Sequence, residues 1–346
     1  MLSVAGSLLA VLLLAQSTAA PLPKIDRFAP SNLYPTSVFK RPLAANPPLH
    51  PRSNAIVARF LAASAGYTDL RSDAAGGDWN TPIYVSSSSD PAYSVNCVKP
   101  WGTCNVQNTI VHIPAYARAE RAEDGHLDIV DVASGYEYNL WQAGDANGNL
   151  HISGNTLSIS WGGRTRIGGA GLEAEGNHAG FAASALTLYP AELLAGHIDH
   201  ALGINVPCAD DPAVFPAMLH ETDGPCKAAN SPYYGMLIQL NMSDAEIDAL
   251  ETSRYDKVIK KALAHYGGYV YDTGSPNGIL ALSYLTYTTQ GLADPWLATI
   301  LPDMQRYGVA QGSGDRWKLG PMFGGMGIDW TNKLRIIAPC VPAKTC

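Results

Sequence analysis

Six cysteines limit the folds open to this chain of 346 residues. They lie in three close pairs, whose members are seven, eighteen and six positions apart: Cys97 and Cys104, Cys208 and Cys226, Cys340 and Cys346. An even number of cysteines in an exported chain indicates disulfides, and no pair has the C-x₂-C spacing of a zinc site. We predict that each cysteine bonds to its near neighbour and that three loops are closed in this way.

An apolar N-terminal segment indicates that the chain is exported. Val4 to Ala15 is an apolar core, and small residues follow it up to Ala20. We predict a signal peptide over residues 1–19, although the first twenty residues contain no Lys or Arg. No later apolar run approaches the roughly 18 residues that span a bilayer. The sequence therefore predicts an extracellular or periplasmic protein with no membrane span.

The composition favours strands and argues against nucleic acid as a partner. Charged residues make up 15% of the chain, and the net charge is −7, whereas a nucleic-acid-binding surface is basic. Turn-forming residues are abundant, with 33 Gly and 24 Pro, and there are 17 Tyr. Low charge with many turn formers and tyrosines is typical of an extracellular β-rich protein.

Periodicity divides the chain into an arm and one domain. Eight prolines between residues 20 and 52 predict an extended N-terminal arm. Apolar alternation predicts strands at 79–85, 109–114, 126–131, 136–143, 157–161, 197–204, 236–240, 269–272 and 333–337. Helices are predicted at 54–65, 190–195, 243–250 and 254–266. We predict one domain over residues 53–346, a β-sandwich or jelly-roll-like fold with a short helix pair on one edge.

The stretch from Gly162 to Val206 contains the densest group of polar candidates. It begins with six glycines in fifteen residues, a pattern that tolerates tight turns and close approach of a ligand. Glu173 and Glu175 are two residues apart, so on an extended chain both carboxylates point to one face. They could divide acid and base roles, or belong to a solvated loop. On the predicted strand 197–204, His200 shares the apolar face, where it is either a base or a buried structural histidine.

Several segments resemble a group of secreted bacterial proteins with no established activity. They are His126 to Asp131, Tyr136 to Ala143, Pro190 to Leu202, Phe215 to His220, and Tyr266 to Ser275. The resemblance implies an exported β-rich fold. It draws attention to five residues, which are His126, Asp131, His200, His220 and Asp272. The chain departs from this pattern in the long Gly/Glu loop before His178.

Motif searches exclude several enzyme classes and leave two function classes. The chain lacks G-x-S-x-G, GxxxxGK[ST] and H-E-x-x-H. The first class is a secreted enzyme that cleaves a polysaccharide. A hydrolase would use two carboxylates, drawn from Glu173, Glu175, Asp131 and Asp272, with His200 and His220 as further proton-transfer or orienting groups. A lyase would instead use His200 with Tyr138, and Arg164 or Arg166 would neutralise a uronate.

The second class is a non-catalytic carbohydrate-binding or cell-surface protein. Four tryptophans could stack on sugar rings or belong to the core: Trp79, Trp101, Trp141 and Trp161. We expect a polysaccharide or another extracellular glycan as the partner in either class. No motif indicates a cofactor. Asp145 to Asn149 could hold Ca²⁺ but lacks the EF-hand spacing, which favours a plain turn.

Overall fold

The computed structural model describes residues 25–62, 68–71, 80–173, 176–210, 212–218, 226, 228–274, 278–313 and 316–346. The molecule is rich in strands, with about 26% strand and about 23% helix in four sheets. The described residues contain more helices than the four segments that the sequence predicted. The predicted signal peptide lies outside the described residues, and the division into an arm and one domain remains a prediction.

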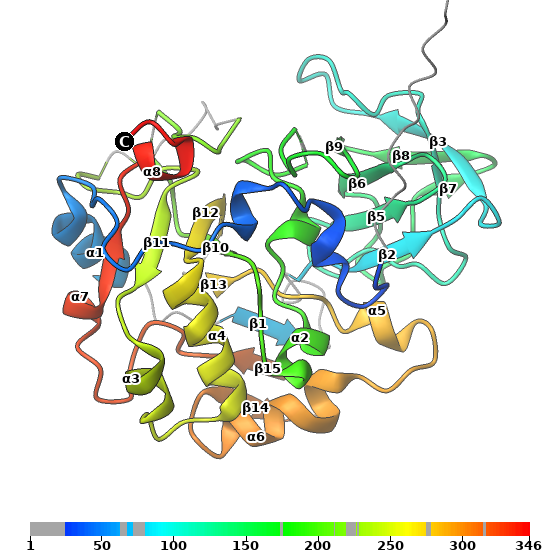
Figure 1. The fold of residues 1–346 in the computed structure, drawn as a ribbon. Helices are drawn as coiled ribbons and strands as arrows, with labels where there is room; N and C mark the ends of the chain where they lie inside the picture. The colour runs from blue at the N-terminus through cyan, green and yellow to red at the C-terminus, as the bar shows by residue number, and fades with distance from the viewer. Residues whose placement is uncertain are drawn as a thin grey trace, which may run out of the picture.

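The largest sheet has five strands and is of mixed direction (Figure 1). Its order is β13 (Gly278–Ile279), β10 (Leu202–Val206), β12 (Gly268–Thr273), β11 (Leu237–Leu240) and β16 (Leu334–Ile336). Strands β10 and β12 run parallel, and their neighbours run antiparallel to them. Their apolar side chains belong to the larger of two hydrophobic cores. This sheet therefore has one parallel pair, at its centre.

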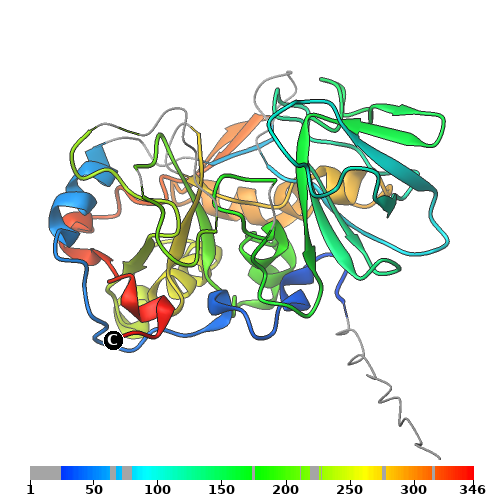
Figure 2. The same cartoon turned by 90° about the horizontal axis from the view of Figure 1, so that it is seen from above.

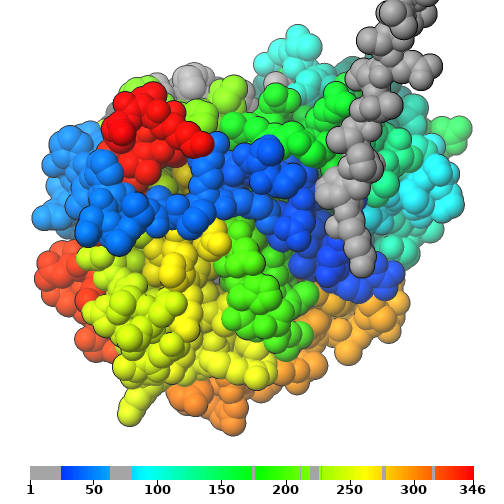
Figure 3. All heavy atoms as spheres, in the orientation of Figure 1, coloured from blue at the N-terminus to red at the C-terminus, as the bar shows by residue number. Residues whose placement is uncertain are grey.

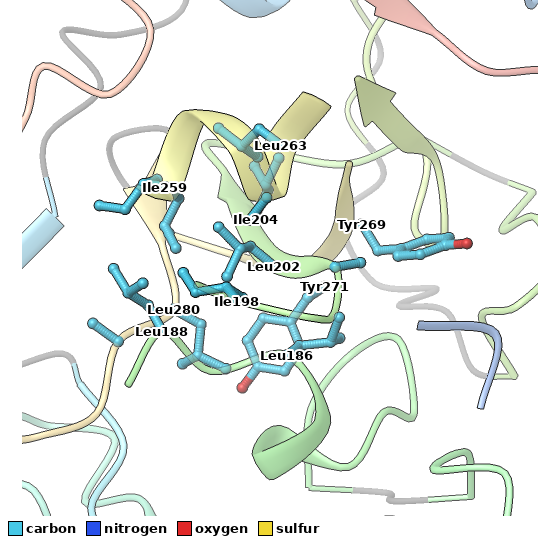
Figure 4. Packing of buried hydrophobic residues seen from close by; sticks show 14 of the residues in the cluster. Leu186, Leu188, Ile198, Leu202, Ile204, Ile259, Leu263, Tyr269, Tyr271 and Leu280 are labelled. Carbon is cyan, nitrogen blue, oxygen red and sulfur yellow. The ribbon is translucent and has the colours of Figure 1, made fainter. Parts of the chain in front are cut away.

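Helix α4 covers this sheet and continues its core. The helices of the described chain are α1 (Ser53–Ala62), α2 (Pro190–Ala195), α3 (Asp244–Asp248), α4 (Arg254–His265), α5 (Leu285–Thr288), α6 (Leu301–Gln305), α7 (Trp330–Lys333) and α8 (Cys340–Ala343). Short helical segments add η1 (Pro30–Leu33), η2 (Val38–Lys40), η3 (Ala183–Ala185) and η4 (Trp296–Ile300). Figure 4 shows Ile259 and Leu263 of α4 facing β10. The capping box that the sequence predicts at Ser243 and Glu246 starts α3.

Two four-stranded sheets meet in the second core. One has the order β2 (Ile83–Ser86), β5 (Leu127–Asp131), β6 (Tyr136–Trp141) and β9 (Trp161–Arg166). The other has the order β4 (Ile110–His112), β3 (Ala92–Cys97), β8 (Thr156–Ile159) and β7 (Ile152–Ser153). Figure 2 shows these strands as a separate strand-rich part beside the larger body. The predicted hairpin is confirmed, because β5 and β6 pair antiparallel across a turn at Gly135.

A small sheet of three strands packs elsewhere on the larger body. It has the order β1 (Thr68–Arg71), β15 (Arg316–Leu319) and β14 (Ala310–Ser313). All of its pairs are antiparallel. It joins a segment near residue 70 to the C-terminal third of the chain.

The sheet β2-β5-β6-β9 is buried on both faces. Tyr138, Leu140 and Ile129 belong to the second core, whereas Ile83 and Val130 belong to the larger core. In the antiparallel register, residues opposite each other share a face, so Asp128, Asn139 and Glu137 lie on the side of the larger core. This sheet is consequently the layer between the two cores, and polar side chains lie within it.

The proline-rich N-terminal segment packs on the body and does not extend from it. Tyr34 and Phe39 are fully buried, and η1 and η2 interrupt the extended conformation that the prolines predicted. Figure 3 shows this segment as a blue band across one face of the molecule. Sequence alone missed this docking because proline density reports local stiffness, whereas the apolar Leu33, Tyr34 and Phe39 find partners far along the chain.

The three disulfides join the predicted pairs: Cys97–Cys104, Cys208–Cys226 and Cys340–Cys346. Disulfides are typical of extracellular and periplasmic proteins. Within the described residues, no helix combines the length and apolar character that a bilayer crossing requires.

Candidate active site

A half-exposed histidine paired with a carboxylate lies near the end of β12. Nδ1 of His178 donates a hydrogen bond to Oδ1 of Asp272, because a carboxylate can only accept. The backbone N–H of Thr273 donates to the same oxygen over 2.8 Å. The side chain of His178 is 42% exposed and that of Asp272 is 14% exposed. This pairing fixes the tautomer of His178 and presents an imidazole edge to solvent.

Tyr234 fixes the ring plane of His178. The two rings stack with centroids 5.7 Å apart and planes 24° apart. Tyr234 itself is 2% exposed, so the imidazole rests on a rigid, buried surface. Stacking and the carboxylate together hold the ring in one orientation, as a proton-transfer group requires.

The pair lies at the carboxyl end of the parallel strands β10 and β12. Asp272 is next to last in β12, and the register places it beside Asn205, which is next to last in β10. The side-chain oxygen of Asn205 is buried and makes no hydrogen bond within the described part of the chain. In open sheets, the carboxyl ends of parallel strands are the usual place for a ligand.

The loop that carries His178 is closed and anchored. An isolated bridge joins Leu172 to Phe181, and the side chain of Asn177 bonds both the backbone N–H and the carbonyl of Phe181, at 3.0 and 2.6 Å. The exposed Glu173 has a positive φ of 93°, and its N–H donates to the carbonyl of Gly180 over 3.0 Å. The loop therefore holds Glu173 and His178 on one folded segment.

Gly176 ties this loop to the buried sheet. A Cβ added at Gly176 would lie 2.5 Å from both Cβ and the carbonyl oxygen of Asn139. Only glycine permits that approach without a shift of the backbone. The Gly-rich segment that the sequence singled out thus packs on β6, two residues before His178.

A buried pair of acids underlies the loop. Nδ2 of Asn139 donates to Oδ1 of Asp128 over 2.5 Å and to Oε1 of Glu137 over 3.4 Å, so one amide bridges both carboxyl groups. Glu137 also accepts from the hydroxyl of Tyr34 over 2.9 Å, from the backbone N–H of Ser184 over 3.0 Å and from the Ser184 hydroxyl. Glu137 thereby connects the strand-rich part to the N-terminal segment and to η3.

Burial perturbs both acids. Burial, and then the charge of Glu137, raises the pKa of Asp128 well above its usual range. Burial also raises the pKa of Glu137, and its hydrogen bonds with Ser184, Tyr34 and Asn139 oppose that rise. Oδ2 of Asp128 and Oδ1 of Asn139 make no hydrogen bond within the described residues. The pair therefore favours the neutral form, as expected for two acids close together in a dry layer.

Further carboxyl groups surround Tyr271. Burial raises the pKa of its phenol well above the usual range, and the charges of four acids raise it further: Asp272, Asp128, Glu120 and Asp124. Acidic side chains therefore surround the strand end beside His178.

The other predicted site residues lie apart from this pair. His200 is fully buried, with Nε2 3.0 Å from Glu192 and Nδ1 2.7 Å from the carbonyl of Ala201. It does not lie on a strand, because the left-handed Gly196 ends α2 and β10 begins only at Leu202. The prediction of a strand over 197–204 is wrong at its start. The geometry of His200 is that of a structural histidine.

Asp131 stabilises a turn and joins two sheets. Its Oδ1 accepts from the N–H groups of Ala133 and Ser134 at 3.0 and 3.2 Å, and its Oδ2 is 3.0 Å from Nδ1 of His112 on β4. It is fully buried and faces away from Glu137, because neighbouring positions on a strand alternate. Glu175 and His220 lie outside the described residues, so the structure brings together Asp272, His178 and the loop of Glu173.

The groups considered for a lyase are not grouped at this site. The hydroxyl of Tyr138 donates to the carbonyl of Ile110 over 3.1 Å, inside the second core. The guanidinium of Arg164 lies 4.5 Å from the centroid of Tyr136, and Arg166 is exposed. The contacts of Tyr138 and Arg164 therefore lie within the strand-rich part.

Among the described residues, one group of side chains has the geometry to hold a metal ion. Ligand atoms of Glu120, Asp124 and His126 all lie within 4.8 Å of one another, and a mixed set of two carboxylates and an imidazole suits Zn²⁺ or Mn²⁺. The Ca²⁺ candidate at Asp145 is a turn, since its Oδ1 accepts from the N–H groups of Asn147 and Asn149 at 2.8 and 3.0 Å.

The sequence analysis missed the buried acids, although the hairpin contained their signal. With Asp131 opposite Tyr136, counting back along the antiparallel register places Asp128 opposite Asn139. Polar residues facing each other across a buried hairpin indicate a hydrogen-bonded cluster. His178 was noted only as part of a polar stretch, because its partner Asp272 is 94 residues away.

Comparisons of the chain with protein-family models, curated proteins and solved structures gave no match.

Proposed function

We propose that this protein is a secreted enzyme that cleaves a polysaccharide, with His178 as the proton-transfer group. The observation that carries the proposal is the His178–Asp272 pair, half-exposed at the carboxyl end of the parallel strands. A fixed imidazole with a carboxylate on Nδ1 can accept at Nε2 the proton of a water molecule that attacks the anomeric carbon, while the bond from that carbon to the leaving oxygen breaks. Glu173, exposed on the same loop, is then the group that protonates the leaving sugar oxygen.

The charge around Tyr271 favours hydrolysis over elimination. In glycoside hydrolysis the sugar ring becomes positively charged in the transition state, and nearby acids stabilise that charge. Elimination from a uronate instead develops negative charge, which the same acids would oppose. We therefore propose a hydrolase that acts on neutral sugars. A sandwich-like packing of the two four-stranded sheets would be the rigid support beside this site.

A non-catalytic carbohydrate-binding protein is the second candidate. The observation that favours it is the grouping of Trp101 with Trp141 and Trp161, whose ring centroids lie 5.5 and 5.9 Å from that of Trp101. Tryptophan rings offer flat apolar faces for the C–H face of a sugar. The two candidates differ in one measurable property, the release of new chain ends.

The test is release of reducing sugar and of an unsaturated uronate from a panel of neutral and acidic polysaccharides. We expect reducing ends from a neutral polymer without ultraviolet absorbance. His178→Ala and Asp272→Asn should each lower turnover about 10²-fold or more, and Glu173→Gln should lower it by a similar factor. Ultraviolet absorbance would replace the hydrolase by a lyase, and binding without any release would favour the second candidate.

A second histidine–carboxylate pair provides a matched control. His265 Nε2 lies 2.8 Å from Asp244 Oδ1 at the surface, with both side chains 52% exposed. His265→Ala removes the same kind of pair at a place with no role in the proposal, so turnover should stay within twofold of the unmodified protein. If His265→Ala and His178→Ala lost activity equally, His178 would have no special role.

A further inference from the structure

Three tryptophans gather where the two four-stranded sheets meet at one end. Trp101 stacks on Trp141 with ring planes 30° apart, and it lies at 44° to Trp161. Trp101 is 58% exposed, while the other two rings are half-buried. An exposed aromatic ring that packs on two other rings is suited to stacking on a ligand.

The loop that carries Trp101 is held in place at several points. The disulfide Cys97–Cys104 closes it. Backbone N–H groups of Val98 and Lys99 donate to the carbonyls of Ile159 and Ser160 at 2.9 and 3.3 Å. The exposed ring is therefore presented by a constrained loop, which lowers the conformational entropy lost when a ligand binds.

Strand alternation places Trp141 and Trp161 on the sheet face that supports the candidate active site, and Trp161, at the end of its strand, also packs against the second core. Trp141 and Trp161 are opposite each other at the ends of β6 and β9, in the same register in which Asn139 faces Gly163 and Glu137 faces Thr165. Opposite positions two residues apart share one face of a sheet. The tryptophan pair is thus two positions along β6 from Asn139, on which the loop of His178 packs.

The surroundings of the rings suit a sugar chain better than a protein partner. Trp141 donates from Nε1 to Oδ1 of Asp124 over 2.9 Å, and Gln142 and Ser160 are hydrogen-bonded beside it at 2.5 Å. Sugar rings combine apolar C–H faces with hydroxyl edges, and such polar groups can bind the edges. On the loop, the exposed large apolar residues are Trp101 and Val98. Two side chains are too few to cover the roughly 800 Å² that each partner buries in a stable protein interface.

The acidic side chain beside the tryptophans favours neutral sugars over uronates. The carboxylate of Asp124 accepts a hydrogen bond from Trp141, and it would repel a uronate chain that passes the rings. A neutral chain meets no such barrier. Pyranose rings with equatorial hydroxyls expose continuous C–H faces, which are the faces that stack on flat aromatic rings.

We propose that Trp101, Trp141 and Trp161 form a sugar-binding site that holds a neutral polysaccharide chain beside His178. This inference rests on the proposed function, because it assigns the substrate of the same enzyme. The site would bind successive rings of the chain at a distance from the bond that is cleaved. Its contribution would therefore appear in affinity for the polymer, and hence mainly in KM.

Isothermal titration tests the proposal with four neutral hexasaccharides, which are β-1,4-linked glucose, xylose and N-acetylglucosamine and β-1,3-linked glucose. At least one should bind to the His178→Ala protein, in which cleavage is removed. Trp101→Ala, added to that protein, should weaken binding tenfold or more, and Trp101→Phe should restore part of it. A trigalacturonate should not bind.

Tyr307→Ala is the matched control, because Tyr307 is an aromatic residue that is 50% exposed elsewhere. It should leave binding unchanged, and circular dichroism should show that all variants are folded. The inference is overturned if no hexasaccharide binds, or if Trp101→Ala binds as well as its parent. Binding that depends on Trp101 without any cleavage would refute the proposed hydrolase alone. Cleavage with an unchanged KM in Trp101→Ala would refute this inference alone.

Discussion

Two buried acids, Asp128 and Glu137, lie in the sheet that supports the candidate site. Asp128 is 2% exposed and Glu137 is fully buried, and Asn139 bonds them both. Burying an ionised carboxylate is costly, so the neutral forms are favoured there. The carboxylate of Asp272 and the stacked ring of Tyr234 hold His178, and Gly176 lets its loop pack on β6. Each of these contacts depends on a residue distant in sequence.

The buried acids predict how stability depends on pH. The fold raises the pKa of both groups above their ordinary values of 3.8 and 4.5, so their contribution is fully present below those values and is lost as pH rises through the raised ones. We expect the free energy of unfolding to fall as the pH rises above about 4.5. Asp128→Asn keeps the carbonyl that accepts from Asn139 and should flatten this fall, as measured by urea unfolding.

The control for this measurement is Glu123→Gln, since Glu123 is exposed in the neighbouring loop. It should keep the pH dependence of the unmodified protein. Glu246, whose pKa is lowered to about 2 mainly by Lys333, acts below pH 4.5 and so leaves this window untouched. An equal fall in Asp128→Asn and in the unmodified protein would show that the fold does not raise the pKa of Asp128.

Among the elements, those with strong periodicity were predicted best. The apolar spacing from Val258 to Tyr266 predicted helix α4, and the structure buries Val258, Ile259 and Leu263 as expected. The strand predicted from residue 197 begins instead at Leu202, because Gly196 and the bonds of His200 hold the preceding residues out of the ladder. Short alternating runs are ambiguous, since a loop can satisfy the same pattern.

Helix α4 should be sensitive at its buried face. Leu263 is 2% exposed and faces the sheet (Figure 4), so Leu263→Ala should lower the free energy of unfolding by about 2–5 kcal/mol. Leu194→Ala on α2 is the control, because Leu194 is 45% exposed and should cost under about 0.5 kcal/mol. Chemical denaturation of both variants measures the difference. A loss under about 0.5 kcal/mol at Leu263 would place it outside the core.

At the scale of the whole molecule, the N-terminal segment joins both parts. Tyr34 donates to Glu137 on β6, Ser31 donates to Glu192 on α2 over 2.7 Å, and Phe39 meets Phe181 and Tyr269 edge-on at 4.9 and 5.2 Å. The segment thereby crosses from the strand-rich part to the five-stranded sheet (Figure 3). Its docking closes the core from one side.

Limited proteolysis tests this docking. An extended arm would be cut by trypsin after Lys40 and Arg52, whereas here the Lys40 ammonium donates to Asn32 over 2.7 Å and the Phe39 ring is buried beside it. We expect both sites to resist trypsin in the native protein and to be cut in urea, as followed by mass spectrometry. Rapid native cleavage after Lys40 would show that the segment is an undocked arm.

The sequence by itself determined the features that depend on neighbours along the chain. The cysteine pairs, the capping box at Ser243, helix α4 and the hairpin at Gly135 all follow from spacing over a few residues. Tertiary structure decided the distant partners of His178 and Glu137, because the contacts of His178 with Asp272 and of Glu137 with Ser184 and Tyr34 join segments between 47 and 103 residues apart. No local pattern specifies such a pairing, since it arises only when the sheets, the Gly-rich loop and the N-terminal segment pack together.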